Sequence, residues 1–375
     1  MTRYRSGEVR IVISGGGTGG HVFPAISIAN AIMRKYPMAD ILFVGAQKKM
    51  EMEKIPEEGY SIIGLPISGF NRKNPLKNIP LFFKLLISLN RCRHIVREFD
   101  PHVVVGVGGY ASGPMLQAAA DLDTPTLIQE QNSYAGITNR ILGRRANIIC
   151  VAYEGMERFF PADKIVLTGN PIRKNLHITN ATRDKAVARH GLDPTKKTVL
   201  VLGGSLGART INESLLSHLE DIRQSDVQFI WQTGKYYYDK VIEQISEVGE
   251  IPNIHVTDFI SDMRIAYRAA DMIISRAGAG SISEFQALKK AVILVPSPNV
   301  SENHQHKNAM ALVENGAAIL VPDTDAREKL IPLAIQAVHD DETLDSLRKH
   351  ITAMARPDAA DRIAELVIHL AKNKV

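Results

Sequence analysis

Two glycine-rich loops are the features of this sequence that most directly suggest chemistry. The first, Ser14-Gly-Gly-Gly-Thr-Gly-Gly-His21, follows the apolar run 9–13, and the second, Gly203-Gly-Ser-Leu-Gly-Ala-Arg209, follows the apolar run 198–202. Each loop lies between a β-type run and a helical pattern, where backbone N–H groups and the helix dipole favour a phosphate or a developing negative charge. The repetition predicts two nucleotide-fold domains in tandem, with a phosphate-bearing substrate between them.

The first loop satisfies the G-x-G-x-x-G pattern of dinucleotide-binding folds, but its context disfavours that function. The acidic residue expected after the second strand is missing, because the run 41–45 continues with Ala46 and Gln47. A Walker A loop is also disfavoured, since His21 stands where Lys is needed. At the expected N-terminus of a helix, His21 stays neutral and is a candidate base or hydrogen-bond donor; the alternative is a capping or packing histidine.

Two further polar loops follow strands in the second half. Residues 275–284 form a loop rich in small residues that ends at Glu284. The Glu284 carboxylate can accept two hydrogen bonds from a ribose diol; the alternative is that Glu284 is an ordinary first-turn helix residue. Residues 296–309 are rich in groups that hold sugar hydroxyls or phosphate. A two-histidine metal site is disfavoured there, because His304 and His306 cannot share a helix face.

Two D-x-D patterns resemble the signature of metal-dependent sugar transferases. Asp121 and Asp123 end an alanine-rich helical pattern before a proline, and Asp323 and Asp325 open a helix after Pro322. Turn and cap roles are therefore favoured for both pairs.

The segment 66–99 is strongly apolar yet rich in Lys and Arg, beginning with Arg72 and Lys73. As a helix it can turn Leu81, Phe82, Leu85, Ser88 and Leu89 toward a core, which leaves Ile79, Phe83 and Leu86 beyond it. Apolar side chains next to cations are typical of a helix that dips into an anionic membrane surface. Membrane contact and ordinary packing both stay open on this pattern.

Composition predicts an ordinary globular protein. The chain has 375 residues, 45% hydrophobic and 23% charged, with a net charge of +5. Residues 1–172 hold 20 Lys and Arg against 14 Asp and Glu, so the basic excess lies in the first half. The two cysteines, Cys92 and Cys150, fit core positions in a reducing compartment. No signal-peptide or membrane-spanning pattern is present, and we expect the protein to stay inside the cell.

Strand-like runs alternate with helical patterns throughout, which predicts an α/β fold with parallel sheets. The first set lies near 9–14, 41–45, 61–65, 103–107, 126–129, 147–151 and 165–168, and the second near 198–202, 227–231, 254–257, 271–275, 291–295 and 318–321. Residues 342–373 read as two helices. Because ligands bind beyond the carboxyl ends of parallel strands, we expect two Rossmann-like domains facing a cleft.

Seven motifs, taken together, carry a resemblance to one family. They are the run 16–24, the run 106–114, Gln129-Glu-Gln-Asn132, Gly169-Asn-Pro-Ile-Arg173, the second loop at 203–208, the third loop at 275–284, and His304-Gln305 before Asn308-Ala309. The chain resembles the MurG family, the N-acetylglucosaminyltransferases of glycosyltransferase family 28 that act in bacterial peptidoglycan synthesis and have the GT-B fold.

The resemblance implies a role for each domain. Residues 1–170 would bind lipid I (undecaprenyl-pyrophosphoryl-N-acetylmuramyl-pentapeptide) and an anionic membrane surface, with a C-terminal helix, 357–373, packing back on them. Residues 171–356 would bind UDP-N-acetylglucosamine. The implied location is peripheral, at the cytoplasmic face of the inner membrane, with no cofactor, metal or nucleic acid.

The resemblance also implies site residues. The Ile260 backbone would contact uracil, and Glu284 would bind the ribose. Ser205 and Arg173 would bind the diphosphate. The remaining donor contacts would come from Thr18, Gly19, Gly20, Asn132, Ala279, His304 and Gln305. Acceptor and membrane contacts would come from Gly108, Gly109, Tyr110, Arg72, Lys73, Ile79, Phe82, Phe83 and Leu86. Two positions depart from the family pattern: Leu206 replaces the usual Gln, and Gly280-Ser281 replaces the common Leu-Thr.

The implied reaction inverts the anomeric carbon, because the muramyl 4-hydroxyl attacks C1 from the face opposite UDP. It needs a base, for which His21 is favoured and Glu130 is the other candidate. Arg173, Ser205 and a helix N-terminus would stabilise the departing diphosphate. The alternatives are another lipid glycosyltransferase of this fold, a UDP-N-acetylglucosamine 2-epimerase and a noncatalytic nucleotide-sugar-binding module.

Overall fold

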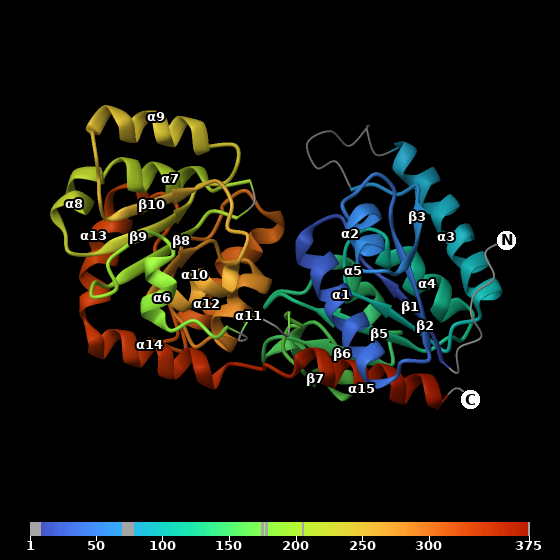
Figure 1. Ribbon diagram of the computed structural model, residues 1–375. Coiled ribbons are helices and arrows are strands. Elements are labelled where there is room, and N and C mark those ends of the chain that lie inside the picture. Colours follow the sequence, from blue (N-terminus) through green and yellow to red (C-terminus); the bar gives the residue numbers. More distant parts are fainter. Residues whose placement is uncertain (1–8, 70–78, 174–175, 177–178, 205, 374–375) are drawn as a thin grey trace. The chain divides into compact units, whose positions relative to one another are not determined.

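The computed structural model describes all residues except 1–8, 70–78, 174–175, 177–178, 205 and 374–375. The chain divides into two compact units (Figure 1). Unit 1 comprises residues 1–172 and 356–375, and unit 2 comprises residues 173–355.

Unit 1 contains a seven-stranded sheet in the order β3-β2-β1-β4-β5-β6-β7. Its strands pair in parallel, and their bounds are β1 Val9–Ser14, β2 Ala39–Ala46, β3 Ser61–Leu65, β4 Val103–Gly106, β5 Thr126–Glu130, β6 Ile148–Val151 and β7 Ile165–Leu167. All the carboxyl ends therefore lie at one edge, where the loops to the following helices begin.

Helices cover both faces of this sheet, as a parallel sheet requires. On one face, α1 (Gly19–Lys35) and α15 (Ala359–Lys372) pack over the odd-numbered residues of β1, and α2 (Glu51–Glu57) adds Ile55. On the other lie α3 (Ile79–Phe99), α4 (Ser112–Asp121) and α5 (Ile137–Gly143), with the 3₁₀ turn Met156–Arg158 packed there through Met156. A second 3₁₀ turn, Ala162–Lys164, precedes β7. The last helix, α15, is tied to α1 by Arg34–Asp361 and Lys35–Glu365 ion pairs of 2.5 and 2.6 Å.

Unit 2 contains a six-stranded parallel sheet in the order β10-β9-β8-β11-β12-β13. Its strands are β8 Thr198–Leu202, β9 Gln228–Gln232, β10 Ile254–Thr257, β11 Met272–Ser275, β12 Ala291–Leu294 and β13 Ile319–Leu320. Its helices are α6 Arg183–Ala188, α7 Arg209–Leu216, α8 Leu219–Gln224, α9 Tyr238–Val248, α10 Met263–Ala269, α11 Ala279–Ala287, α12 His304–Val313, α13 Ala326–His339 and α14 Asp341–Ala353, with a 3₁₀ turn at Ser301–Asn303.

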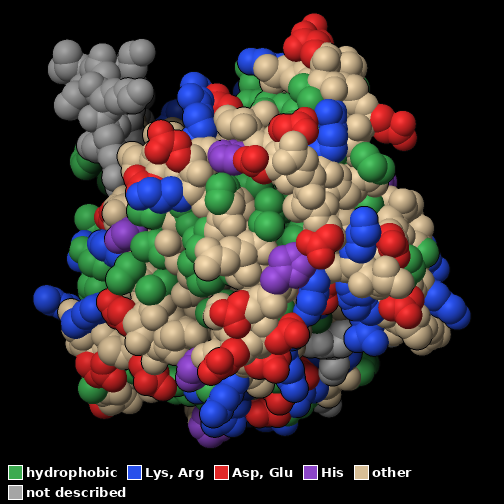
Figure 2. All heavy atoms as spheres, turned by 90° about the vertical axis from the view of Figure 1, so that its left-hand side faces the viewer, with side chains coloured by type: hydrophobic (Ala, Val, Ile, Leu, Met, Phe, Trp, Pro, Cys, Tyr) green, Lys and Arg blue, Asp and Glu red, His purple; other side chains and the backbone are tan. Residues whose placement is uncertain are grey.

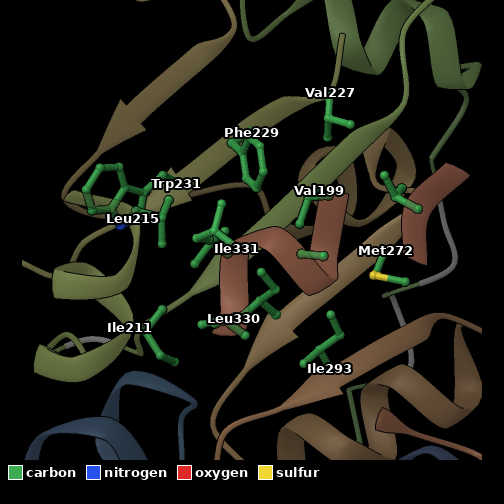
Figure 3. Close-up of a cluster of buried hydrophobic side chains, with 14 of the residues drawn as sticks. Val199, Ile211, Leu215, Val227, Phe229, Trp231, Met272, Ile293, Leu330 and Ile331 are labelled. Atoms are coloured by element: carbon green, nitrogen blue, oxygen red, sulfur yellow. The ribbon is translucent and has the colours of Figure 1, made fainter. Parts of the chain in front are cut away.

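The core of unit 2 forms where alternate strand residues meet α7 and α13. Figure 3 shows Phe229 and Trp231 of β9 beside Leu215 of α7 and Ile331 of α13. The buried Trp231 indole donates to Asn212 at 2.9 Å, so its one polar group is satisfied inside the core. One face of the sheet that carries the second loop is thereby packed against α7 and α13.

The predicted fold class is confirmed: each strand-like run corresponds to a parallel strand, and the C-terminal segment forms two helices. Cys92 and Cys150 are buried and unpaired, as expected for core residues. On the surface drawn in Figure 2, basic and acidic side chains are interspersed. Within the described residues, no helix is long and apolar enough to cross a membrane.

The predicted core face of the apolar segment is wrong at two positions. Phe82 and Leu85 of α3 are 60% and 42% exposed, together with Phe83, Leu86 and Ile87. Among the α3 residues whose side chains the structure describes, the buried ones begin at Ser88 and continue with Cys92, Ile95, Val96 and Phe99. The exposed apolar surface, here named the α3 patch (Phe82, Phe83, Leu85, Leu86 and Ile87), is therefore broader than predicted.

The D-x-D aspartates hold the predicted turn and cap positions at Asp123, whose φ is 52°, and at Asp325, whereas Asp121 and Asp323 make ion pairs. Asp121 accepts hydrogen bonds from Arg93 and Arg145 at 2.9 and 2.8 Å, and Asp323 pairs with Arg276. Asp325 occupies the N-cap position of α13 without a capping hydrogen bond from its side chain. Within the described residues, moreover, no group of three His, Cys, Asp or Glu is arranged to hold a metal.

Candidate active site

The first glycine-rich loop connects β1 to α1 at the carboxyl edge of the unit 1 sheet. Gly16 and Gly17 have φ of 152° and 88°, which non-glycine residues avoid. The helix begins at Gly19 with Thr18 at the N-cap, and the Thr18 side chain makes no capping hydrogen bond. Thr18, Gly19 and Gly20 thus lie where the dipole of α1 favours negative charge.

The N–H groups of this loop are less available than the sequence pattern predicts. Gly17 N donates to both carboxylate oxygens of Glu51, each at 3.0 Å, and Glu51 is fully buried at the start of α2. The expectation that the backbone N–H groups of this loop favour a phosphate is therefore wrong at Gly17, because an internal carboxylate already occupies that position.

His21 lies in the first turn of α1, as predicted. Its Nδ1 is 3.2 Å from the Gly16 carbonyl oxygen and 3.3 Å from the Thr18 hydroxyl. Since a carbonyl oxygen only accepts, the Gly16 contact requires a proton on Nδ1 and places the lone pair of the neutral ring on Nε2. This is the arrangement that a general base needs.

Gly108 and Gly109, after β4, close over the first loop. A Cβ at Gly108 would lie 2.7 Å from Cδ2 and 2.9 Å from Nε2 of His21, and one at Gly109 would collide with the Gly16 backbone. Both have positive φ, 92° and 85°. Tyr110, 49% exposed, follows them. The structure thus brings Gly108 directly against the His21 ring and Gly109 against the backbone of Gly16.

Glu130, the second candidate base, is used differently. Its buried carboxylate accepts hydrogen bonds from Asn132 N, Gly136 N and the Asn139 side chain at 3.0, 3.0 and 2.8 Å, and from the Asn132 side chain at 3.3 Å. Burial raises the pKa of Glu130, while these hydrogen bonds lower it. Both oxygens are engaged in shaping the loop that presents Asn132, so the geometry favours His21 as the base.

The second glycine-rich loop connects β8 to α7 in unit 2. The Gln232 side chain donates to the Gly204 carbonyl at 2.9 Å, and Gly207 N donates to the same oxygen at 2.9 Å. A Cβ at Gly234 would collide with Gly207, so the loop fits tightly on the end of β9. Leu206 is 79% exposed. Ser205 lies outside the described residues.

Glu284 lies in α11, beyond the first turn, so the first-turn alternative is wrong. Its Oε2 accepts a 2.7 Å hydrogen bond from the hydroxyl of the buried Tyr267, whose ring stacks edge-on against Phe285. Burial raises the pKa of Glu284, against the lowering effects of the Tyr267 hydrogen bond and the Arg173 charge. Arg173 and Glu284, predicted to hold diphosphate and ribose, are therefore electrostatically coupled.

Ile260 belongs to the loop between β10 and α10. A hollow of about 250 Å³ is lined there by His255, Phe259, Ile260 and Ser261, among others. The rings of His190 and His255 are 4.8 Å apart in its wall, and burial lowers the pKa of His190 to about 4. His190 is therefore neutral near pH 7, while Arg189 and Asp262 contribute charged groups to the same lining.

The remaining predicted donor contacts also lie at helix starts. Ala279 begins α11 and His304 begins α12, and neither helix has a side-chain cap at its N-cap residue. Gln305 accepts from Ser297 N at 2.8 Å, which ties the polar loop 296–303 to α12. Arg72 and Lys73 lie outside the described residues, and of Ile79 only its place in α3 is described.

Two buried residues that support the site, Glu51 and Tyr267, were not predicted from the sequence. Glu51 lies in a charged stretch that reads as an exposed helix, and Tyr267 lies on a short helix without a motif. The only available signal was position, since Glu51 follows the carboxyl end of β2 and Tyr267 follows the Ile260 loop.

Comparison with known proteins agrees with this geometry. The family model "Glycosyltransferase family 28 N-terminal domain" matches residues 11–151, and "Glycosyltransferase family 28 C-terminal domain" matches residues 198–363. A relative from Bacteroides fragilis is 58% identical over 97% of this chain and 96% of its own length. It is named UDP-N-acetylglucosamine–N-acetylmuramyl-(pentapeptide) pyrophosphoryl-undecaprenol N-acetylglucosamine transferase. The chain belongs to the MurG family of glycosyltransferase family 28.

Other MurG relatives and solved structures extend the comparison. A Bacteroides thetaiotaomicron protein of the same name is 57% identical over 97% of this chain and 98% of its own. The crystal structure of Acinetobacter baumannii MurG matches with a TM-score of 0.78 and 26% identity, covering 96% of this chain and 99% of that one. A UDP-N-acetylglucosamine 2-epimerase matches with a TM-score of 0.65 at 14% identity, which reflects the shared GT-B-like fold alone.

Proposed function

We propose that this protein transfers N-acetylglucosamine from UDP-N-acetylglucosamine to the muramyl 4-hydroxyl of lipid I, forming lipid II for peptidoglycan synthesis. The observation that carries the proposal is 57–58% identity to transferases of that name over 97% of the chain. The ordered loops at the carboxyl edges of both sheets support it, because they supply a histidine whose Nδ1 contacts a carbonyl oxygen, helix starts without side-chain caps and the buried carboxylate of Glu284.

Unit 2 is proposed to bind the donor. Uracil would occupy the hollow beside Ile260, and Glu284 would accept hydrogen bonds from the ribose hydroxyls. Arg173 and the start of α7 would stabilise the diphosphate as the bond to C1 breaks, since positive charge and helix N–H groups favour a developing anion. Ala279, His304 and Gln305 would contact the sugar.

Unit 1 is proposed to supply the base and the acceptor site. His21 Nε2 would accept the proton of the muramyl 4-hydroxyl as its oxygen attacks C1, and UDP would depart from the opposite face with inversion. Gly108, Gly109 and Tyr110 would contact the acceptor, while Asn132, with Thr18, Gly19 and Gly20, would contact the donor from this unit.

The α3 patch is proposed to bind the membrane that carries the acceptor. Its five apolar side chains are between 42% and 61% exposed, and Lys84 and Arg91 are exposed on the same helix. Burying such side chains among lipid chains, next to cations that attract anionic headgroups, gives peripheral binding. The proposed location is the cytoplasmic face of the inner membrane.

The test is UDP release by the purified protein with UDP-N-acetylglucosamine, with and without a short-chain lipid I analogue, together with product mass. Release that depends on the analogue, with a disaccharide-lipid product, is expected. Conversion of the donor to its 2-epimer, or release that is indifferent to the analogue, would refute the assigned acceptor.

A further inference from the structure

The carboxylate beneath the first glycine-rich loop is positioned for more than structural support. Glu51 is fully buried, and its Oε1 accepts from Ala46 N as well as from Gly17 N, both at 3.0 Å. A Cβ at Gly16 would collide with the same carboxylate. The loop therefore closes on Glu51 as it would on a bound anion.

One peptide group connects this carboxylate to the ring of His21. The N–H of the Gly16–Gly17 peptide donates to Glu51, and the carbonyl of the same peptide contacts His21 Nδ1 at 3.2 Å. A peptide whose N–H faces a negative charge is polarised, so its carbonyl oxygen becomes a stronger acceptor. Glu51 and His21 are thus coupled through a single amide without touching.

We propose that Glu51 is the positioning residue of the base: acting through the Gly16–Gly17 peptide, it holds His21 with its proton on Nδ1 and its lone pair on Nε2. The logic is that of a carboxylate that orients a catalytic histidine, with a peptide group inserted between them. The inference rests on the proposed function, in which His21 is the base.

The other ionisable groups around the ring do not provide this link. Glu130 is engaged by its own loop, and the side chain of Tyr110 is exposed and extends toward Gly69. Lys48 and Lys49, which precede α2, are exposed. Among the described residues, Glu51 is the carboxylate whose hydrogen bonds reach the first loop.

The central variant is Glu51→Gln, whose amide oxygen can still accept from the Gly17 and Ala46 N–H groups but carries no charge. We expect kcat to fall about tenfold, because the base is weaker and less firmly oriented, with KM for UDP-N-acetylglucosamine unchanged. The Glu51 charge favours the imidazolium form, so its removal should shift the acid limb of kcat/KM to lower pH by about half a unit.

A structural role alone would give a different result. Asp271→Asn is the matched control, because Asp271 is a partly buried carboxylate in unit 2 that accepts from Arg183 and from Thr198 N. It should lower thermal stability and leave the acid limb in place. If Glu51→Gln behaves like this control, the positioning role is refuted.

Histidine NMR tests the inference without turnover. In the unaltered protein the side-chain ¹⁵N shifts of His21, assigned by comparison with His21→Gln, should report a proton on Nδ1. A proton on Nε2 would overturn the inference, whether or not Glu51→Gln folds. If the protein lacks transfer activity but shows the Nδ1 proton, the proposed function fails while the Glu51–His21 coupling stands.

Discussion

The first glycine-rich loop rests on a buried carboxylate, whereas the described part of the second rests on the Gln232 amide and on backbone groups. The negative charge of Glu51 disfavours a second anion at Gly17 and supports a basic histidine. The neutral support of the second loop leaves the dipole of α7 available to a diphosphate. Two loops with similar glycine spacing are therefore suited to opposite halves of one reaction, proton removal and leaving-group stabilisation.

The strongest way to break this comparison is His21→Ala. If the first loop serves proton transfer, kcat should fall by about 10² to 10⁴ while UDP affinity stays unchanged, since base catalysis contributes on that scale. Calorimetric UDP titration and the lipid I analogue assay check both quantities. A loss of UDP affinity equal to the loss of rate would assign His21 itself to donor binding instead of proton transfer.

Glu130→Gln sharpens the choice of base. Its carboxylate accepts four hydrogen bonds within one loop, so the variant should reduce the melting temperature and raise KM through Asn132. The acid limb of kcat/KM should stay where it is in the unaltered protein. If the acid limb of kcat/KM disappears in Glu130→Gln but persists in His21→Ala, Glu130 and not His21 is the base.

The two units are also expected to differ in membrane binding, which is assigned to the α3 patch of unit 1. Replacing Phe82, Phe83 and Leu86 by Ser removes three exposed apolar side chains and should lower binding to anionic vesicles at least tenfold, with UDP affinity retained. Ile242 and Val248 on α9, 39% and 42% exposed, provide a matched control pair in unit 2. Vesicle sedimentation unchanged by the α3 variant would exclude this patch as the membrane contact.

Tyr267→Phe tests whether unit 2 also uses an indirect support. The ring and its contact with Phe285 remain, but Glu284 loses its 2.7 Å hydrogen bond, so KM for the donor should rise about tenfold with kcat unchanged. Because that hydrogen bond lowers the pKa of Glu284, its loss raises this pKa further, and the rise of KM on acidification should begin at higher pH.

The ratio of the affinities for UDP and 2′-deoxy-UDP is a second measurement on Tyr267→Phe. This ratio should decrease in the variant if Tyr267 orients Glu284 toward the ribose diol. Tyr153→Phe is the control, because the Tyr153 hydroxyl is buried without a hydrogen-bond partner in the described structure, and its removal should leave both nucleotides bound as before.

The fold was predictable because the spacing and type of apolar residues distinguish strands from helices. Buried β-branched runs such as 198–202 are recognisable wherever they occur. The glycine loops and His21 were predictable for a similar reason, since a backbone conformation restricts residue type locally. Glu51 and Tyr267 were not, because each acts through a partner distant in sequence, Gly17 or Glu284, and no local pattern encodes that pairing. The prediction that Phe82 and Leu85 face the core was wrong because the helical spacing of apolar residues does not indicate where a helix begins to pack on a sheet.

The smallest expected effect concerns Gly280, where this chain departs from the family pattern. A Cβ there meets nothing within 4 Å, and α11 continues through the position. Gly280→Ala should therefore stabilise the protein by about 0.5 kcal/mol through reduced freedom of the unfolded chain, with donor KM unchanged. Gly207→Ala is the contrasting variant, because its φ is 83° and its Cβ would collide with Thr233. Chemical denaturation separates the two, and a raised donor KM in Gly280→Ala would mean that the open space at α11 belongs to the substrate.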